Sequence, residues 1–556
     1  MIRSLALVVA LCPLAVASQA SSQGTPVDLF VGVPDAVASV PANDKKIVRE
    51  HLGALRLDVL EQSAERQGGF GRLALPLFDG EVIVTRVARV EQAANDGWVW
   101  VGTIEGSVED SVMLSVVGDT VVGSIHSQDR LFAVRYAGAG LHALAEIDQS
   151  GFDGCGTEAG GHDHSQAGAP APLGPVVPLL PGLKTPAKAL AAGAANNPPT
   201  IDILVVYTPE ARSEAGGTSA MDALINLAIT ETNDAYAQSQ VDQEVRLVGT
   251  AEMTGYTESG SIFTELSRLT TFGDGFLDQA HTLRNQYAAD AVDLIVADGG
   301  GTCGVAHLMK TPDNTFSQLA FSCTVRSCAT GYYSFGHELG HNFGSHHNNN
   351  GGGVPGASFL YSFGFRTADN VYRTIMSGSP GLRIRRFSNP NITYNGYAMG
   401  IADPDFFSAE NWKSLNNTAP VTSQWRCANT VQYGTGKLTS TGLTPVLSGV
   451  GSPQVSVSGF KLELAHAEPN KSAIAFYGFV QADKPWNGGS LYVSGFKQRL
   501  GVQTTNANGA GIWDFPLTTG FVPGDQLFAQ VWFRDPTHPD GTTAGLSNGL
   551  RIDVCD

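Results

Sequence analysis

The chain has 556 residues, of which 42% are hydrophobic, so it can form several globular domains and is too apolar for a disordered protein. Its 7 cysteines are too few for a scaffold built on disulfides. The net charge of -18 is carried by only 15% charged residues, which gives a weakly acidic, polar surface and argues against nucleic acid as a partner.

The first 20 residues predict a cleaved secretory signal peptide. Arg3 precedes an apolar run from Leu5 to Val16, and small residues follow this run. The run is shorter than the ~20 residues that a helix needs to span a bilayer, and we expect no membrane span elsewhere. The sequence therefore predicts a secreted, extracellular protein in an oxidising compartment, where cysteines can form disulfides.

Residues 21–159 predict a β-rich region, because apolar and polar residues alternate after turn pairs such as Asp79-Gly80 and Asp96-Gly97. A helix is expected before these strands, near residues 45–67. Residues 160–199 are rich in Ala, Gly and Pro, a composition that disfavours both helix and sheet. They predict an exposed linker.

Residues 200–427 combine buried strands with amphipathic helices and predict one α+β domain. Strands are expected at 201–207, 245–250 and 292–298, and helices after Ser219 and at 275–287. Beyond Cys427 the helical pattern ends, and short strands with Gly or Pro breaks predict an accessory β-sandwich over residues 428–556. The sequence does not indicate a ligand for this last domain.

The sequence SFGHELGHNFGSHH, at residues 334–347, has the spacing of a metal site. If this segment is helical, His337 and His341 lie one turn apart on the same face, so their two imidazoles can bind one cation. Glu338 lies beside them and does not have to bind the metal itself.

Gly344 can adopt the left-handed conformation that ends such a helix and turns the chain sharply. The turn would return His347 as a third nitrogen ligand. Its neighbour His346 is the alternative, and the spacing favours His347. Three neutral imidazoles with one open position are the ligand set of catalytic Zn²⁺, whereas a structural site has four protein ligands.

This pattern resembles that of the metzincin metallopeptidases, HExxHxxGxxH followed by a methionine turn, which here is Met376 in RTIMSG. The segments VVYTPEAR, ETNDAY, CGVAHLM and FSNPNITYNG are similar to the reprolysin-like group, and specifically to the secreted peptidyl-Asp metalloendopeptidase family. The resemblance covers about residues 198–427. It implies a metzincin-type catalytic domain, in which a mixed twisted sheet carries the active-site helix, and it implies that the β-rich region is a pro-region.

Two positions depart from the patterns of such enzymes. Asn348 follows the third histidine where many reprolysin-like enzymes carry Asp, which leaves open the hydrogen bond that the Asp would make. Gly378 stands two residues after Met376, so the tyrosine of astacin-like relatives is missing. Met376 is expected to form an apolar floor under the zinc, since a thioether is a poor zinc ligand beside three imidazoles.

These residues predict a zinc-dependent endopeptidase, made as a latent precursor. Zinc lowers the pKa of its bound water to about 7, and Glu338 is expected to accept the proton of that water as general base. The substrate is expected to be an extended or unfolded polypeptide that pairs with an edge strand near residues 304–309. On this strand, His307 is expected to be merely exposed.

Two other classes of function are left open by the sequence. A non-catalytic adhesion or carbohydrate-binding protein would act through residues 428–556, and the intact Glu338 argues against it. Another zinc hydrolase, such as an amidase, would have the same metal ligands, and only the family resemblance argues against it.

The cysteines that follow the linker allow more than one disulfide pairing. Cys303 is expected to pair with Cys328, because both flank the excursion from the edge strand to the helix and recur in the family pattern. Cys427 is expected to pair with Cys555, because that cross-link would join the ends of the last domain. Cys323 is then left over, and a pair between Cys303 and Cys323 is the alternative.

The segment after the methionine turn, GLRIRRFSNP, carries Arg383, Arg385 and Arg386. In metzincins this segment lines the pocket for the side chain that follows the cut bond. A guanidinium there would pair with a carboxylate, in agreement with the family's preference for cutting before Asp or Glu. The alternative is that the three arginines are simply solvated.

Cys155, in GFDGCGTEAG, is the candidate for a cysteine switch. A thiolate is a strong zinc ligand, so Cys155 at the open position would keep the precursor inactive until the linker is cut. The resemblance to known switches is short, Cys155-Gly156 alone. The alternative is a disulfide between Cys155 and Cys323.

Overall fold

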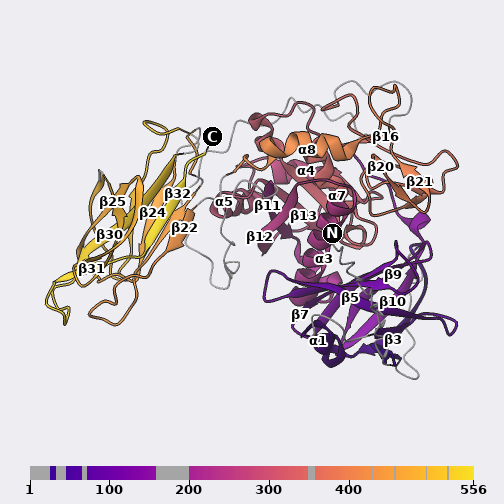
Figure 1. Cartoon of the computed structure of the whole chain (residues 1–556), viewed down its shortest axis with the longest axis horizontal. Coiled ribbons are helices and arrows are strands. Elements are labelled where there is room, and N and C mark those ends of the chain that lie inside the picture. Colours follow the sequence, from indigo (N-terminus) through magenta and orange to yellow (C-terminus); the bar gives the residue numbers. More distant parts are fainter. Residues whose placement is uncertain are drawn as a thin grey trace, which may run out of the picture.

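The computed structural model describes residues 25–32, 45–65, 72–157, 199–348, 357–426, 430–451, 453–455, 459–495, 498–522 and 525–555. These residues form an N-terminal β-rich region, a central region of mixed helix and sheet, and a C-terminal region of strands (Figure 1). The expected signal peptide, the linker up to residue 198, and Cys427 lie outside the described residues.

The N-terminal region is one ten-stranded sheet in the order β1-β4-β5-β6-β7-β8-β9-β10-β3-β2. Its elements are β1 (Val27–Asp28), β2 (Phe30–Gly32), β3 (Ile47–Leu55), α1 (Leu57–Glu65), β4 (Arg72–Pro76), β5 (Val82–Gln92), β6 (Trp98–Ile104), β7 (Ser111–Val117), β8 (Thr120–Ser127), β9 (Arg130–Gly138) and β10 (Leu141–Ile147). The expected helix at 45–67 is wrong in its first half, because Ile47–Leu55 pairs antiparallel with β10 and only Leu57–Glu65 is helical.

The central region contains a five-stranded sheet in the order β12-β11-β13-β15-β14. Its strands are β11 (Thr200–Tyr207), β12 (Glu244–Glu252), β13 (Ala291–Val296), β14 (Gly304–Ala306) and β15 (Phe321–Val325). All neighbours are parallel except β14, which pairs antiparallel with β15 and forms one edge. The strands expected from the sequence at 201–207, 245–250 and 292–298 coincide with β11, β12 and β13.

Helices cover both faces of this sheet, so its strands are buried on both sides. They are α2 (Pro209–Ala215), α3 (Thr218–Gln238), α4 (Ile262–Thr270), α5 (Asp278–Tyr287), α6 (Arg326–Ala329) and α7 (Ser334–Asn342). On β11, Ile203 and Val205 pack in the core that contains α3 and α7, while Leu204 and Val206 pack in the core that contains α4 and α5. This alternation follows from the twofold period of a strand.

Helix α3 is also in contact with the N-terminal sheet. Met113 and Val117 of β7 belong to the same buried cluster as Met221 and Ile225 of α3, while the other face of β7 packs in a separate core that includes α1. Figure 1 shows the N-terminal sheet lying directly below α3. The N-terminal region and the central region therefore share one hydrophobic core.

After α7 the chain forms a lobe of short paired strands, closed by one helix. These elements are β16 (His346–Asn348), β17 (Phe363–Gly364), β18 (Tyr372–Arg373), β19 (Leu382–Arg383), β20 (Asn389–Tyr394), β21 (Tyr397–Met399) and α8 (Asn411–Thr422). The parallel pair of β18 and β19 brings the segment after Met376 beside the segment before it.

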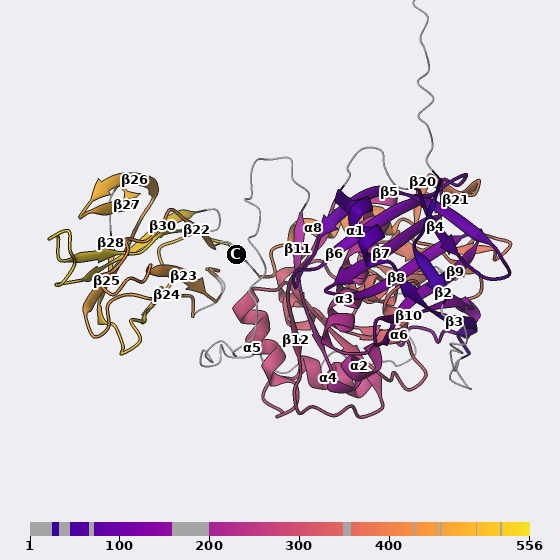
Figure 2. The ribbon, with the colours of Figure 1, turned by 90° about the horizontal axis from the view of Figure 1, so that it is seen from below.

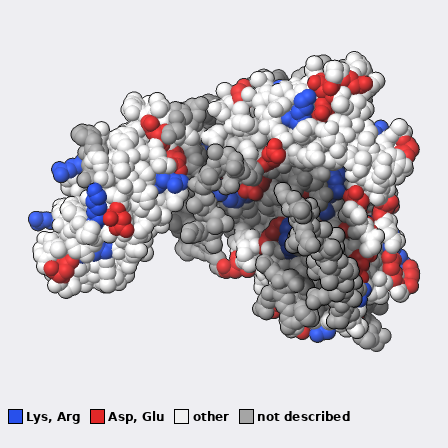
Figure 3. Space-filling view, viewed as in Figure 1, with Lys and Arg blue, Asp and Glu red and all other residues white. Residues whose placement is uncertain are grey.

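The C-terminal region is built from strands alone and stands apart from the rest in both ribbon views (Figures 1 and 2). Its strands are β22 (Thr430–Tyr433), β23 (Val446–Val450), β24 (Lys461–Ala465), β25 (Ser472–Gly478), β26 (Val480–Trp486), β27 (Gly489–Ser494), β28 (Gln498–Thr504), β29 (Gly511–Asp514), β30 (Gln526–Arg534), β31 (Ala544–Leu546) and β32 (Gly549–Asp553). A six-stranded and a three-stranded sheet contribute to one core. On the face shown in Figure 3, charged side chains are scattered among uncharged ones, as the low charge content predicts.

Candidate metal centre

Helix α7 places two of the predicted ligands on one face. His337 and His341 lie one turn apart within this helix, and both side chains are buried. Just beyond the helix, Gly344 has a φ of 91°, in the left-handed region that favours glycine. The chain turns back at this point, and β16 then carries His347 towards the two helical histidines.

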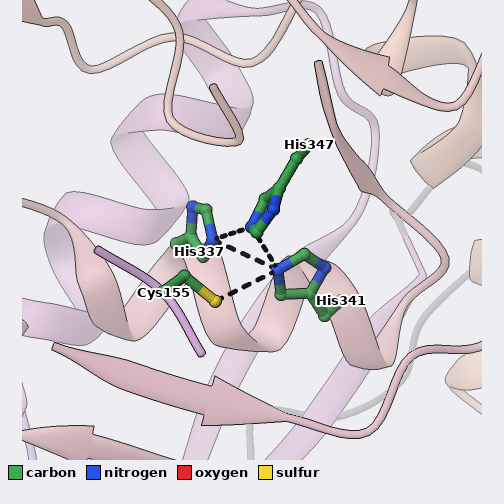
Figure 4. A group of neighbouring side chains, drawn as sticks. All are labelled: Cys155, His337, His341 and His347. Atoms are coloured by element: carbon green, nitrogen blue, oxygen red, sulfur yellow. Dashed lines mark hydrogen bonds between the residues drawn. The ribbon is translucent and has the colours of Figure 1, made fainter. Parts of the chain in front are cut away.

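The three imidazoles meet at one point (Figure 4). The Nε2 atoms of His337 and His341 are 3.1 Å apart, and each lies 3.0 Å from Nε2 of His347. The Sγ of Cys155 approaches the same point and lies 3.6 Å from Nε2 of His341. All four ligand atoms are within 4.8 Å of one another.

The hydrogen bonds of the helical histidines fix their tautomers. Nδ1 of His337 donates to the carbonyl of Ile375 at 2.7 Å, and Nδ1 of His341 donates to the carbonyl of Ser345 at 2.8 Å. Because a carbonyl can only accept, both Nε2 atoms carry lone pairs. Burial is the main cause that holds the pKa of each ring well below 6.5, so both are neutral.

The donor set fits a divalent metal ion. Converging lone pairs on neutral imidazoles repel one another unless a cation lies between them. Tetrahedral zinc with nitrogen ligands at its usual distance would separate those nitrogens by about 3.3 Å, close to the separations between the three Nε2 atoms. The carbonyls of Ile375 and Ser345 orient the rings, as the outer partners of metal-binding histidines usually do.

Glu338 lies on α7 directly after the first of these histidines. It is fully buried, and burial raises the pKa of its carboxyl to about 8. Its Oε2 accepts from the thiol of Cys155 at 3.4 Å, and its Oε1 has no hydrogen-bond partner among the described residues. Gly304 makes room for this carboxylate, since a Cβ at that position would lie 2.4 Å from Oε1.

Met376 and Asn348 lie around the metal cluster without belonging to it. Met376 is fully buried, and a Cβ on Gly340 of α7 would lie 2.6 Å from its sulfur, so Met376 packs against the helix that carries the ligands. Asn348 Oδ1 accepts from the hydroxyl of Ser377 and from the main-chain N–H of Gly378, each at 2.9 Å. The amide thus ties the strand of the third histidine to the methionine turn.

The N-terminal region reaches the centre through residues 149–157, here named the Cys155 segment. Cys155 forms a parallel bridge with Gly304 of β14, and the N–H of Gly156 donates to the carbonyl of Gly304 at 2.9 Å. Thr157 Oγ1 accepts from the N–H of Ala306 at 3.1 Å. The segment therefore occupies the edge strand on which a substrate was expected.

The three arginines after the methionine turn are buried, which contradicts the alternative that they are solvated. Arg385 pairs with Asp234 of α3 at 2.7 Å. Arg386 pairs with Glu109 of the N-terminal region at 2.8 Å. Arg383 donates to the carbonyl of Tyr332 at 3.0 Å.

The structure settles part of the disulfide pairing. Cys303 and Cys328 form a disulfide, as predicted, and Cys323 is a free, buried thiol, which excludes its pairing with Cys303 or Cys155. Cys555 is disulfide-bonded, while its expected partner lies outside the described residues.

Two further histidines were singled out in the sequence. His307 is half-buried and lies 2.8 Å from Thr270 Oγ1, so the prediction that it is merely exposed is wrong. His346 is buried against the ring of Phe363, and it is His347 that joins the metal cluster.

Sequence reasoning missed several residues that shape the centre. Gln149 holds the main chain of Arg383, Thr157 holds that of Ala306, and Arg373 lies opposite Arg383 across β18 and β19. No local pattern marks these positions. Gly304 carried a weak signal, because a glycine inside a strand often marks a close approach of another group.

Comparison with known proteins agrees with this geometry. A family model described as metallo-peptidase family M12 (Reprolysin_5) matches residues 197–388. The peptidyl-Asp metalloendopeptidase of Stenotrophomonas maltophilia is 33% identical over 380 residues, which are 64% of this chain and 84% of that protein. The chain belongs to the peptidyl-Asp metalloendopeptidase family. A second member, from Xanthomonas campestris pv. campestris, is 34% identical over 61% of this chain and 79% of its own length.

As a member of this family, the chain is a metalloendopeptidase with a polypeptide substrate. Its metallopeptidase domain requires a divalent metal ion, and the three histidines are the candidate ligands. None of the helices in the described part of the chain combines the length and the apolar character that a membrane crossing needs.

Proposed function

We propose that the protein is a secreted zinc endopeptidase, made as a latent precursor, that cleaves extended polypeptides before acidic residues. The observation that carries this proposal is the convergence of three imidazoles and one thiol beside a buried glutamate. His337, His341 and His347 would hold the zinc. The C-terminal strands would form an accessory β-sandwich.

Zinc, when bound, supplies a Lewis acid that lowers the pKa of a coordinated water to about 7 and polarises a carbonyl. Glu338 is the general base. In its ionised form the carboxylate can accept a proton from a water held at the centre, because it lies next to the histidines and its Oε1 has no partner among the described residues. Its raised pKa favours this proton transfer. The same carboxyl can then give the proton to the leaving amine.

The substrate would lie along β14, in place of the Cys155 segment. The N–H of Gly156 donates to the main chain of this short edge strand, and the hydroxyl of Thr157 accepts from the N–H of its last residue, Ala306. An edge strand with free main-chain groups binds extended peptides by strand addition. Folded substrates would have to present a loop or an unfolded stretch.

Latency would come from Cys155 in two ways. Its thiol lies where the open position of the metal is expected, and its hydrogen bond engages Glu338. In addition, the Cys155 segment pairs with β14 in the parallel sense, so it occupies the edge strand along which the substrate would lie. A cut in the linker would then allow this segment to leave.

The proposed preference for acidic residues is supported by the names of the relatives, peptidyl-Asp metalloendopeptidases, and by the buried arginines that follow the methionine turn. Arg383, Arg385 and Arg386 are the candidates for reading the acidic side chain. Secretion is supported by the signal-like composition of the first 20 residues.

The function is tested by casein hydrolysis with and without a chelator. We expect activity to vanish on removal of the metal and to return with added zinc. Glu338→Gln is expected to keep the bound metal and to lose about 10²- to 10⁴-fold in turnover, the usual contribution of a general base. Hydrolysis that survives metal removal, or a Glu338→Gln enzyme with normal turnover, would refute the mechanism.

Latency is tested on the full-length precursor with Cys155→Ala. We expect premature activity and self-cleavage. The matched control is Cys323→Ala, which removes the other free thiol of the described residues and should leave the precursor silent. A folded Cys155→Ala precursor that stays latent would contradict the switch.

A further inference from the structure

Arg383 is a buried cation without a counter-ion. Arg383 is 4% exposed, and among the described residues its guanidinium donates one hydrogen bond, from Nη1 to the carbonyl of Tyr332 at 3.0 Å. Its Nε has no acceptor, and no carboxylate among the described residues pairs with it. Buried charges are normally paired, because desolvation is costly.

Arg373 adds a second positive charge at the same place. It stands opposite Arg383 in the pairing of β18 with β19, and it is 1% exposed. Its guanidinium donates to the carbonyls of Gly381 and Ser377 and to the hydroxyl of Tyr332, which are all neutral acceptors. Like charges directly opposite each other on two strands destabilise the pair. The two guanidiniums together favour an anion between or beside them.

The other two arginines differ in this respect. Arg385 shares a buried ion pair with Asp234, a residue of the same domain. Arg386 is paired with Glu109 of the N-terminal region. While the N-terminal region is bound, Arg383 is thus the one of these three arginines without a carboxylate in the described structure, and Arg386 would lose Glu109 when that region leaves.

The site lies next to the metal ligands. Tyr332 comes two residues before α7, and Arg373 comes two residues before Ile375, whose carbonyl holds the ring of His337. A ligand of Arg383 would therefore lie beside the bond that is cut.

The Cys155 segment contacts the residues around Arg383. The ring of Phe152 stacks on Tyr332 with centroids 4.1 Å apart, and the guanidinium of Arg383 lies 4.2 Å from the centre of the same ring. Because both groups are this close to the ring of Tyr332, Phe152 and Arg383 lie on its opposite faces. The side chain of Gln149 pairs with the main chain of Arg383, accepting from its N–H at 2.8 Å and donating to its carbonyl at 3.2 Å. These main-chain groups become free when the segment leaves.

We propose, building on the proposed function, that Arg383 binds the carboxylate of the Asp or Glu side chain that follows the cut bond. Arg383 is the specificity-determining residue, because its planar fork can hold a carboxylate through two parallel hydrogen bonds. Arg373 is a positioning residue, which fixes Tyr332 and the guanidinium of Arg383 stacked on it. In the precursor the Cys155 segment packs against Tyr332 and the main chain of Arg383, so its departure would change the surroundings of this site.

The experiment compares two peptides that differ only in Asp or Asn after the cut bond. The mature wild-type enzyme, Arg383→Gln and Arg383→Lys are assayed for kcat/KM on both. The control is Arg326→Gln, which removes an arginine whose partner is the surface residue Glu214. We expect Arg383→Gln to lose about 10- to 100-fold on the Asp peptide, the value of a charged hydrogen-bonded pair, and little on the Asn peptide. The Arg326→Gln enzyme should keep the wild-type ratio.

The outcomes separate this site from the proposed function. A wild-type enzyme that cuts both peptides equally would refute the acidic preference itself. A wild-type preference that persists in Arg383→Gln, or an equal loss on both peptides, would overturn the role of Arg383 alone. If Arg383→Gln does not fold, Arg383→Lys takes its place, because lysine keeps the positive charge but cannot form two parallel hydrogen bonds. An unchanged ratio of kcat/KM between the Asp and Asn peptides in this variant would also overturn the role of Arg383. On the wild-type enzyme, a product peptide that begins with Asp should inhibit more strongly than its Asn counterpart, and equal inhibition contradicts the site.

Discussion

Gly304→Ala tests how closely the edge strand approaches Glu338, the proposed general base. The added Cβ would lie 2.4 Å from Oε1 of Glu338 and 2.6 Å from its Cγ. Ordinary contact begins near 3.4 Å, so the carboxylate has to move by 3.4 − 2.4, about 1 Å. The backbone of Gly304 does not have the positive φ of a position that requires glycine. The effect therefore comes from the displaced carboxylate and not from backbone strain.

A misplacement of about 1 Å in a catalytic group can cost roughly a hundredfold in rate, or about 2.7 kcal/mol. We expect kcat of the mature enzyme on a peptide substrate to fall by about this factor. The metal content per chain should be unchanged, because the atoms nearest to the new Cβ belong to Glu338 and not to a histidine. The control is Gly378→Ala, where the nearest neighbour of the new Cβ is 4.0 Å away. A Gly304→Ala enzyme with kcat within about threefold of wild type would refute this account of how Glu338 is placed.

Two further predictions concern stability. The disulfide between Cys303 and Cys328 spans a sequence separation of 25. Replacing both cysteines by alanine should therefore lower the free energy of unfolding, measured by urea denaturation, by about 3.5 kcal/mol. A loss below about 1 kcal/mol would contradict this prediction. Glu231 of α3 is buried in the precursor, and burial raises the pKa of its carboxyl to about 7 from 4.5. The folded state therefore holds a proton that the unfolded state loses, and the free energy of unfolding should fall by about 3 kcal/mol between pH 4.5 and pH 7 from this group. Glu231→Gln should remove that part of the slope in urea titrations across this range, and an unchanged slope would contradict it.

The convergence of the three predicted histidine ligands could be predicted because their spacing is local. A helical turn separates His337 from His341, and Gly344 supplies the one conformation that returns the chain, so short-range geometry determines where His347 lies. The position of Cys155 beside these histidines was expected for a chemical reason, since an open metal position favours a thiolate. The hydrogen bonds that position the site could not be predicted, because their partners lie far apart in the sequence.

The arginines show the same limit. All three stand in one short segment, and nothing in that segment distinguishes them. What separates them is the partner that the fold brings to each: Asp234 from α3 for Arg385, and Glu109 from the N-terminal sheet for Arg386. Only the three-dimensional structure shows which guanidinium is left without a carboxylate in the described residues.

The fold was predicted best where hydrophobic runs were long. The strands of the central sheet are buried on both faces and read as continuous apolar runs, as in β11 and β13. The segment Ile47–Leu55 was wrongly expected to be helical, because its place in a sheet depends on pairing with β10, which lies about 90 residues later in the chain. Tertiary pairing overrode the local pattern there.

Helix α3 has consequences for how the enzyme is released. Met113 and Val117 pack with α3 in one hydrophobic cluster, and Ser124 donates to Glu231 of the same helix. Hydrolysis of the linker would break a covalent bond without breaking any of these contacts. If the precursor is latent as proposed, activation would depend on a second event, the dissociation of two non-covalently associated polypeptides. It would then be favoured by dilution and reversed by excess of the free N-terminal fragment. The released fragment would act as a tight-binding inhibitor in trans of the enzyme it leaves.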